Sequence, residues 1–381
     1  LDKRSKKLRS NRMKTVPLPY HVQMLFALLR ASLNETTPEI SYFQNSTEKE
    51  WKDCYHLAAK QGVMALAWDG VAKLPKDMQP PLSIKITWAT GVERYEQKYN
   101  RYCETIVQLS EFYKQHGIST MQIKGVGFST LYPIPSHREG GDIDIFTYSA
   151  APDDLSHKEA NCLADTLIQE QGIEVDTSYP KHSHFYYNNI PVENHKTFVN
   201  VNSYKTAQLI EETLIKCMNP KETILATGKI LTPSPEFNSL FIACHAFQHY
   251  GSGLALHHLC DWAIILKNYG LLIPNEIQDK KILNGFAALT TLSNLYLGTA
   301  IPVDGEDIIA KEMLQEILHP QYSVNNPKKN RVGILVYKTQ RLLYNHRIKN
   351  RILTSSLTKR ILSSIVAHIK APKTIDRKSV V

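Results

Sequence analysis

Two aspartates separated by a single residue, Asp142 and Asp144, are the side chains of this sequence best suited to chemistry. They lie in residues 142–148, where polar and apolar side chains alternate as in a half-buried strand. Residues i and i+2 of a strand share a face, so both carboxylates project together while Ile143 and Ile145 enter the core. Adjacent carboxylates repel each other unless a cation lies between them, and magnesium prefers carboxylate and phosphate oxygens. The spacing therefore predicts a site for two Mg2+ ions, with Mn2+ as the alternative, although solvated strand edges also carry such pairs.

Glycine and positive charge lie close to this pair in the sequence. Residues 119–124 predict a short strand, and the glycines that follow give a turn whose backbone N–H groups can approach a phosphate closely. Lysine and arginine side chains there can pair with the same phosphate oxygens. The expected phosphate contacts are Lys124, Gly125, Gly127 and Arg138. An internal ion pair of Arg138 with Asp142 or Glu139 is the alternative role for that arginine.

A third carboxylate is required if two metal ions act together on a phosphate. Residues 190–198 predict a strand that carries Glu193, His195 and Thr197 on one face. We expect Glu193 to complete the metal site and to act as the base for an acceptor hydroxyl, with Asp176 as the alternative third ligand. We expect His195 to orient Glu193 or to contact the substrate, unless it is a structural histidine.

The order of these motifs resembles a known family. The matching segments are Lys124-Gly125, Leu131-Tyr132-Pro133, Arg138, Gly141-Asp142-Ile143-Asp144 and Val192-Glu193 followed by His195. Together they resemble the uncharacterised bacterial nucleotidyltransferase family of the polymerase-β-like superfamily. Residues 244–249 and 253–261 resemble the C-terminal helical part of that family, so the likeness extends over most of the chain.

The resemblance implies an α+β fold in which helical regions flank a small mixed sheet. It implies transfer of a nucleoside monophosphate from a triphosphate such as ATP to an acceptor hydroxyl or phosphate, with release of pyrophosphate. The nucleotide is then expected between the sheet and the C-terminal helices. Two positions depart from the pattern: Val126 follows Gly125 where the superfamily usually has Gly or Ser, and His257 stands where Arg is common.

Histidines in the second half of the chain suggest other chemistry. His245 and His249 have the i, i+4 spacing of helical zinc ligands, and His257, His258 and Asp261 follow. A metal-dependent phosphohydrolase is therefore an alternative function. The chain lacks the glutamate that a metalloprotease motif has between such histidines, and it lacks the adjacent His-Asp pair of one phosphohydrolase class. We expect these histidines to lie in the core of the helical region. The alternative is that His245, His249 and Asp261 contact the acceptor.

Hydrophobic periodicity divides the chain into parts. The expected parts are a basic extension at 1–17, a helical region at 18–116, an α/β core at 117–205, a helical domain at 206–326 and a basic amphipathic tail at 327–381. Helices are expected at 20–33, after a cap at Ser46 or Thr47, and over 82–116 with Gly117 as the stop. Strands are also expected at 173–178, at 183–187 and from 190 to 201.

The composition of the chain indicates the cellular compartment in which we expect the protein. No apolar run approaches the ~18 residues of a membrane span, and no apolar segment follows the basic start as in a secretory signal. The six cysteines are scattered without a CxxC pair, which argues against a zinc ribbon or a disulfide framework. We expect a cytoplasmic protein, with binding to the membrane surface as an alternative. Met13 is a plausible start, so we expect residues 1–12 to be an extension, a processed leader or an artificial addition.

The net charge of +9 is concentrated at the two ends. Residues 1–14 carry seven Lys or Arg and one acid, and residues 327–381 carry fourteen and one, whereas acids outnumber bases between them. From Arg331 the pattern predicts a basic amphipathic helix, which suits RNA or an anionic membrane surface as partner. Packing of this helix on the body is the alternative. A catalytically inactive docking protein would keep the same tail.

Overall fold

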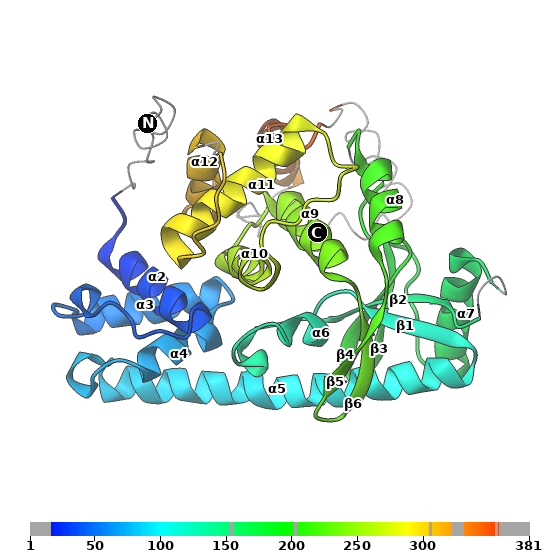
Figure 1. Cartoon of the computed structure of the whole chain (residues 1–381), viewed down its shortest axis with the longest axis horizontal. Helices are drawn as coiled ribbons and strands as arrows, with labels where there is room; N and C mark the ends of the chain where they lie inside the picture. The colour runs from blue at the N-terminus through cyan, green and yellow to red at the C-terminus, as the bar shows by residue number, and fades with distance from the viewer. Residues whose placement is uncertain are drawn as a thin grey trace, which may run out of the picture.

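A mixed β-sheet positions the residues singled out above. The computed structural model describes residues 17–151, 155–201, 204–304, 307–321, 331–354 and 357. Within these ranges six strands form one sheet in the order β3-β4-β2-β1-β6-β5 (Figure 1). The strands are β1 (Ile118–Gln122), β2 (Ile143–Ser149), β3 (His182–Tyr187), β4 (Ile190–His195), β5 (Lys221–Leu225) and β6 (Gly228–Thr232). The expected small mixed sheet flanked by helices is confirmed.

The pairing of β2 sets the geometry of the site. β2 runs antiparallel to β1 and parallel to β4, and the parallel register places Asp144 level with Glu193. On the opposite face Ile143 and Val192 are level with each other and fully buried. Side chains alternate between the two faces of a strand, so burial of this apolar pair directs the neighbouring carboxylates to the other face.

The first helices follow the expected pattern. They are α2 (Tyr20–Leu33), α3 (Glu48–Lys60), α4 (Met64–Ala72) and α5 (Leu82–Gln115), with 3-10 turns η1 (Ile40–Tyr42) and η2 (Lys76–Met78). Thr47 caps α3 through a capping box with Glu50. α5 has 34 residues and runs beneath both the helical layer and the sheet (Figure 1). Gly117 follows it with a φ of 75°, a conformation that ends helices at little cost in glycine.

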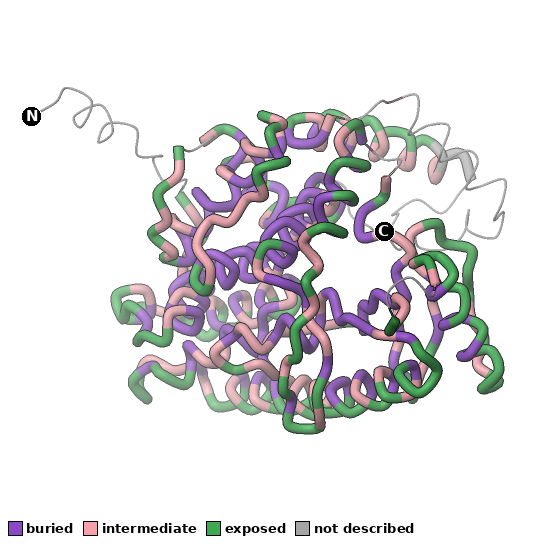
Figure 2. Tube along the Cα trace, turned by 45° about the vertical axis from the view of Figure 1, so that its right-hand side comes forward, coloured by how far each residue is buried: buried purple, intermediate pink, exposed green. Residues whose placement is uncertain are grey.

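The remaining helices pack on the sheet or on one another. They are α6 (Val126–Ser129), η3 (Pro135–His137), α7 (His157–Glu170), α8 (Ala207–Cys217), α9 (Pro235–His249), α10 (Leu256–Tyr269), α11 (Lys280–Leu292), the π-helical turn η4 (Ser293–Leu297), α12 (Asp307–Leu318) and α13 (Arg331–Lys349). Phe146 of β2 stacks on Phe198, whose ring meets Phe237 of α9 edge to face. α5 and α7 pack on the other face, and the outward side of α5 is exposed (Figure 2).

Three sequence predictions about strands were wrong. The hairpin β5–β6 extends the sheet at residues 221–232, inside a stretch predicted to be helical, and its weak apolar alternation reflects its largely exposed position at the sheet edge. Residues 173–178 form only an isolated bridge, between Asp176 and His184. β4 ends at His195, not at residue 201. The division of the chain into domains stays a prediction.

Both charged ends fall largely outside the described residues. All of residues 1–16 and most of the tail beyond Thr354 lie there, and so do residues 322–330. The helix expected from Arg331 is present as α13. Among the described residues no helix combines the length and the apolarity that a bilayer crossing requires.

The loop that leads into β2 is fixed by a buried ion pair. Arg138 donates from Nε to Asp261 Oδ1 and from Nη2 to Oδ2, both at 2.8 Å, and the hydroxyl of Tyr132 donates to Oδ1 at 2.6 Å. Arg138 therefore pairs with α10 and not with Asp142 or Glu139, the sequence-based alternatives. Burial favours a neutral Asp261, but the guanidinium outweighs it and holds the pKa of this carboxyl below its usual value.

The same loop is also fastened to α4 and α5. His137 lies 2.7 Å from Asp69 and 2.9 Å from Glu96, one ring nitrogen to each carboxylate. Further contacts come from Glu139, which accepts from the Ala65 N–H, and from Lys98 and Tyr102, which donate to the carbonyls of Gly140 and Gly141. The backbone that leads to Asp142 is therefore held by contacts with three helices, α4, α5 and α10.

Asp261→Asn should lower the free energy of unfolding by about 3–5 kcal/mol, because it leaves the Arg138 guanidinium buried without a counter-charge. The double change Arg138→Met with Asp261→Leu should recover most of this loss, since neither charge then remains. Urea denaturation followed by circular dichroism measures both. As control, Glu222→Gln removes an exposed ion pair with Lys229 and should leave the midpoint unchanged. A midpoint for Asp261→Asn equal to that of the control would show that the buried pair does not stabilise the fold.

Candidate active site

Three carboxylates gather where β2 begins. Asp142 immediately precedes β2, Asp144 lies within it, and Glu193 is its neighbour on β4. One oxygen from each lies within 4.8 Å of the others. The structure therefore brings together the three residues that the sequence suggested as metal ligands. Asp176, the alternative third ligand, lies apart from this group: its carboxylate accepts from the Ser178 N–H.

The two aspartates have opposite electrostatic environments. Asp144 is buried, with Lys124 Nζ 3.1 Å from Oδ2 and His195 Nε2 3.0 Å from Oδ1. Burial alone would raise the pKa of Asp144, but these two partners hold it far below the usual range. The negative charge of Asp144, together with burial, raises the pKa of Asp142 to about 6. Asp142 is therefore a carboxylate whose charge lacks sufficient compensation from the protein.

His195 braces the acidic cluster. Its Nε2 lies 3.0 Å from Asp144 and 3.6 Å from Glu193, and its Nδ1 lies 3.3 Å from the carbonyl oxygen of Thr197. Burial and the nearby Lys181 lower the pKa of His195, but the two carboxylates outweigh them and raise it above its usual value. His195 is thus close to both Asp144 and Glu193, and its expected orienting role stays a prediction.

The expected phosphate contacts divide into two groups. Lys124, Gly125 and Arg138 lie around the start of α6, where Gly125 has a φ of 76° and its carbonyl faces Arg138 Nη1 at 3.5 Å. Gly127 differs, because its N–H donates to Gln122 Oε1 at 2.7 Å. A Cβ at Gly127 would lie 2.6 Å from the side chain of Thr232. Close packing against β6 therefore explains this glycine.

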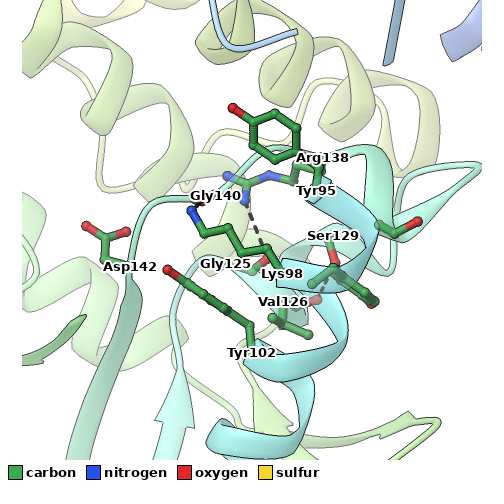
Figure 3. Close-up of a pocket in the computed structure, with 11 residues that line it drawn as sticks. Tyr95, Lys98, Tyr102, Gly125, Val126, Ser129, Arg138, Gly140 and Asp142 are labelled. Atoms are coloured by element: carbon green, nitrogen blue, oxygen red, sulfur yellow. Dashed lines mark hydrogen bonds between the residues drawn. The ribbon is translucent and has the colours of Figure 1, made fainter. Parts of the chain in front are cut away.

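A pocket opens beside Asp142 on the α5 side (Figure 3). It includes about 360 Å3 of space together with its solvent-open mouth. Its lining residues are Tyr95, Lys98, Tyr99, Tyr102, Gly125, Val126, Ser129, Ser136, Arg138, Gly140 and Asp142. The Lys98 and Tyr102 side chains reach from α5 toward Asp142. The pocket thus joins aromatic rings, two cations and one of the three clustered carboxylates.

Lys181 and His182 are site residues that the sequence analysis missed. His182 Nδ1 lies 3.2 Å from Glu193 Oε2, and burial lowers the pKa of His182 to about 4. Burial also lowers the pKa of Lys181, against the opposing effects of Asp144 and Glu193. The sequence feature that could have revealed these residues is the hairpin turn at Asn188-Asn189. This turn sets the register of β3 and β4, which places His182 level with His195.

The helical histidines form a second cluster. His245 and His249 of α9 and His258 of α10 each present a ring nitrogen within 4.8 Å of the others. His258 was not among the expected acceptor contacts. Asp261 was, but both its oxygens are engaged by Arg138. The buried ion pair is therefore the role that the structure shows for Asp261.

A known protein family matches most of the chain. Residues 47–300 match a family described as uncharacterised nucleotidyltransferase. No curated protein matches the chain. The solved structure of an antigenic nucleotidyltransferase-like protein from Paracoccidioides brasiliensis is similar over 56% of this chain and 94% of that one, with 14% identity and a TM-score of 0.33.

The sequence resemblance is thereby confirmed at the level of the family. The bacterial source and the polymerase-β-like superfamily stay implications of the resemblance. The matched segment covers more than half of the residues of this chain. The chain therefore belongs to the family of uncharacterised nucleotidyltransferases.

Proposed function

We propose that the protein is a Mg2+-dependent nucleotidyltransferase. It would move a nucleoside monophosphate from a nucleoside triphosphate to an acceptor hydroxyl or phosphate and release pyrophosphate. The observation that carries this proposal is the cluster of Asp142, Asp144 and Glu193, with Lys124 Nζ 3.1 Å from Asp144 and Lys181 in electrostatic interaction with Asp144 and Glu193. Carboxylates that hold metal ions and cations that hold phosphates are the parts that phosphoryl transfer requires.

The residues present fit a divalent metal. All three candidate ligands are carboxylates, the donors that Mg2+ prefers, and Mn2+ suits the same set. The raised pKa of Asp142 reflects repulsion by Asp144, which a bound cation would offset. When bound, one or two such ions would supply positive charge to the α-phosphate and to the leaving pyrophosphate.

The side chains of the site would then have different roles in the transfer. Lys124, Lys181 and the turn at Gly125 would hold the triphosphate. The acceptor oxygen would attack the α-phosphorus, the bond from that phosphorus to the bridging oxygen would break, and pyrophosphate would leave on the opposite side. Glu193 would take the proton of an acceptor hydroxyl, and His195 would keep Glu193 and Asp144 in place.

Two other readings have less support. A docking protein without catalysis has no need for three carboxylates in one cluster, which is a costly arrangement unless a cation is bound. A phosphohydrolase based on the helical histidines would leave that cluster without a role. A polyanionic partner for the basic ends, with a cytoplasmic or membrane-surface location, stays part of the proposal.

We expect one nucleoside triphosphate to bind only with Mg2+, and Asp142→Asn and Asp144→Asn to weaken that binding at least about tenfold, the loss typical for a damaged metal site. Calorimetric titration of ATP, GTP, CTP and UTP measures this and identifies the donor. Near-ultraviolet circular dichroism checks that each variant is folded. Metal-independent binding that both variants retain would contradict the proposal.

The third carboxylate can be tested by a matched pair of variants. Glu193→Gln should weaken Mn2+ binding in the presence of the bound triphosphate by about tenfold or more, whereas Asp176→Asn should change it less than about twofold. Electron paramagnetic resonance of free Mn2+ gives both affinities. The reverse order would make Asp176 the ligand.

Lys181→Met should weaken triphosphate binding by roughly tenfold, since it removes one charge-assisted contact to the phosphates. Lys196→Met is the control, because Lys196 is close in sequence but donates to the carbonyls of Thr177 and Tyr179. Calorimetry with the donor triphosphate compares them. Equal affinities for the two variants would remove Lys181 from the site.

A further inference from the structure

The second histidine cluster has a defined geometry. His245 and His249 lie one turn apart on α9, with ring centroids 4.7 Å apart. His258 of α10 lies 5.2 Å from His245 and 4.5 Å from His249 by the same measure. The three rings therefore lie close together, and one ring nitrogen of each lies within 4.8 Å of those of the other two.

A backbone contact fixes the proton of His258. The N–H of Ala255 donates to His258 Nδ1 at 3.1 Å, so Nδ1 carries the lone pair and Nε2 carries the proton in the neutral ring. His258 is 3% exposed. Among the described residues Nε2 has no hydrogen-bond partner. A buried N–H donor without an acceptor is costly, and it marks a place where a ligand atom belongs.

This proton argues against a metal ion at the cluster. A metal would need the lone pair of Nε2, yet Nδ1 already uses its own lone pair to accept from the backbone. Metal-bound histidines usually donate their second N–H to an acceptor, the reverse of what His258 does. The cluster therefore offers His258 as a hydrogen-bond donor.

The surrounding charge favours a negatively charged ligand. Burial and the cations around them lower the pKa of all three histidines, that of His249 to about 3, so the rings are neutral at physiological pH. Lys124 acts on all three rings and Lys181 acts on His245 and His249. Lys124 Nζ lies 3.1 Å from Asp144, and Lys181 interacts electrostatically with the same carboxylate, so the same two cations influence the histidine cluster and the carboxylates.

We propose that His245, His249 and His258 form a subsite for phosphate oxygens of a substrate, with N–H groups as donors. Because Lys124, a residue of the proposed nucleotide site, acts electrostatically on all three rings, this proposal rests on the proposed transfer function. Either the outer phosphates of the donor triphosphate or a phosphate group on the acceptor would supply the ligand oxygens. The shared chemistry is that of a phosphate anion held by neutral imidazole donors.

Inorganic phosphate is the probe for a first test, observed by NMR of 15N-histidine-labelled protein. The Nε2–H signal of His258 should shift as phosphate is added. Phosphate affinity should fall roughly tenfold in His258→Phe and in His245→Phe, each of which keeps a ring but removes the donor. His257→Phe is the matched control: His257 is adjacent on α10 but contacts the carbonyl of Gln61, so its affinity should stay within about twofold of wild type.

Repeating the titration with a saturating non-hydrolysable triphosphate separates the two sources. If phosphate still shifts the His258 signal, the subsite belongs to the acceptor; if the triphosphate alone shifts it and blocks phosphate, it belongs to the donor. No response of His258 to either would overturn the proposal. Stoichiometric Zn2+ binding that requires His258 would also overturn it. Triphosphate binding that depends on Asp142 is measured separately, so failure of the subsite is distinguishable from failure of the transfer function.

Discussion

Repulsion between Asp142 and Asp144 is the constraint around which this structure is arranged. Parallel pairing of β2 with β4 adds Glu193 to the same face, which increases the negative charge in a partly buried place. Lys124 and His195 offset the charge of Asp144, whereas in the part of the chain that the structure describes no comparable ion pair offsets that of Asp142. The compensation is therefore incomplete in the protein alone, as expected of a site completed by a cation.

Rigid support is what allows such a site to persist. Carboxylates that repel would move apart if their backbone were free to do so. Asp144 and Glu193 are fixed by strand pairing, and the loop that ends at Asp142 is fixed by helices through Arg138 and His137. The structure stabilises the arrangement through buried polar contacts between residues that are far apart in the chain.

The sequence predicted those parts of the site that depend on local periodicity. Strand alternation puts Asp142 and Asp144 on one face and Glu193 on one face of its own strand, and the pairing of β2 with β4, which alternation does not predict, brings the three together. It could not reveal Lys181, which precedes its strand, nor the pair of Arg138 with Asp261, which lie 123 residues apart. The β5–β6 hairpin was missed for a related reason: an exposed edge hairpin buries little, so its apolar pattern is faint.

The unbroken helix α5 has a mechanical consequence. Its Trp88 lies in the core of the N-terminal helices, its Lys98 and Tyr102 hold the loop before Asp142, and its Leu109 packs beneath the sheet. At about 1.5 Å per residue the helix acts as a rod of roughly 50 Å that passes all three places. Any change that tilted α5 would therefore move Lys98 and Tyr102, and with them the loop that precedes Asp142.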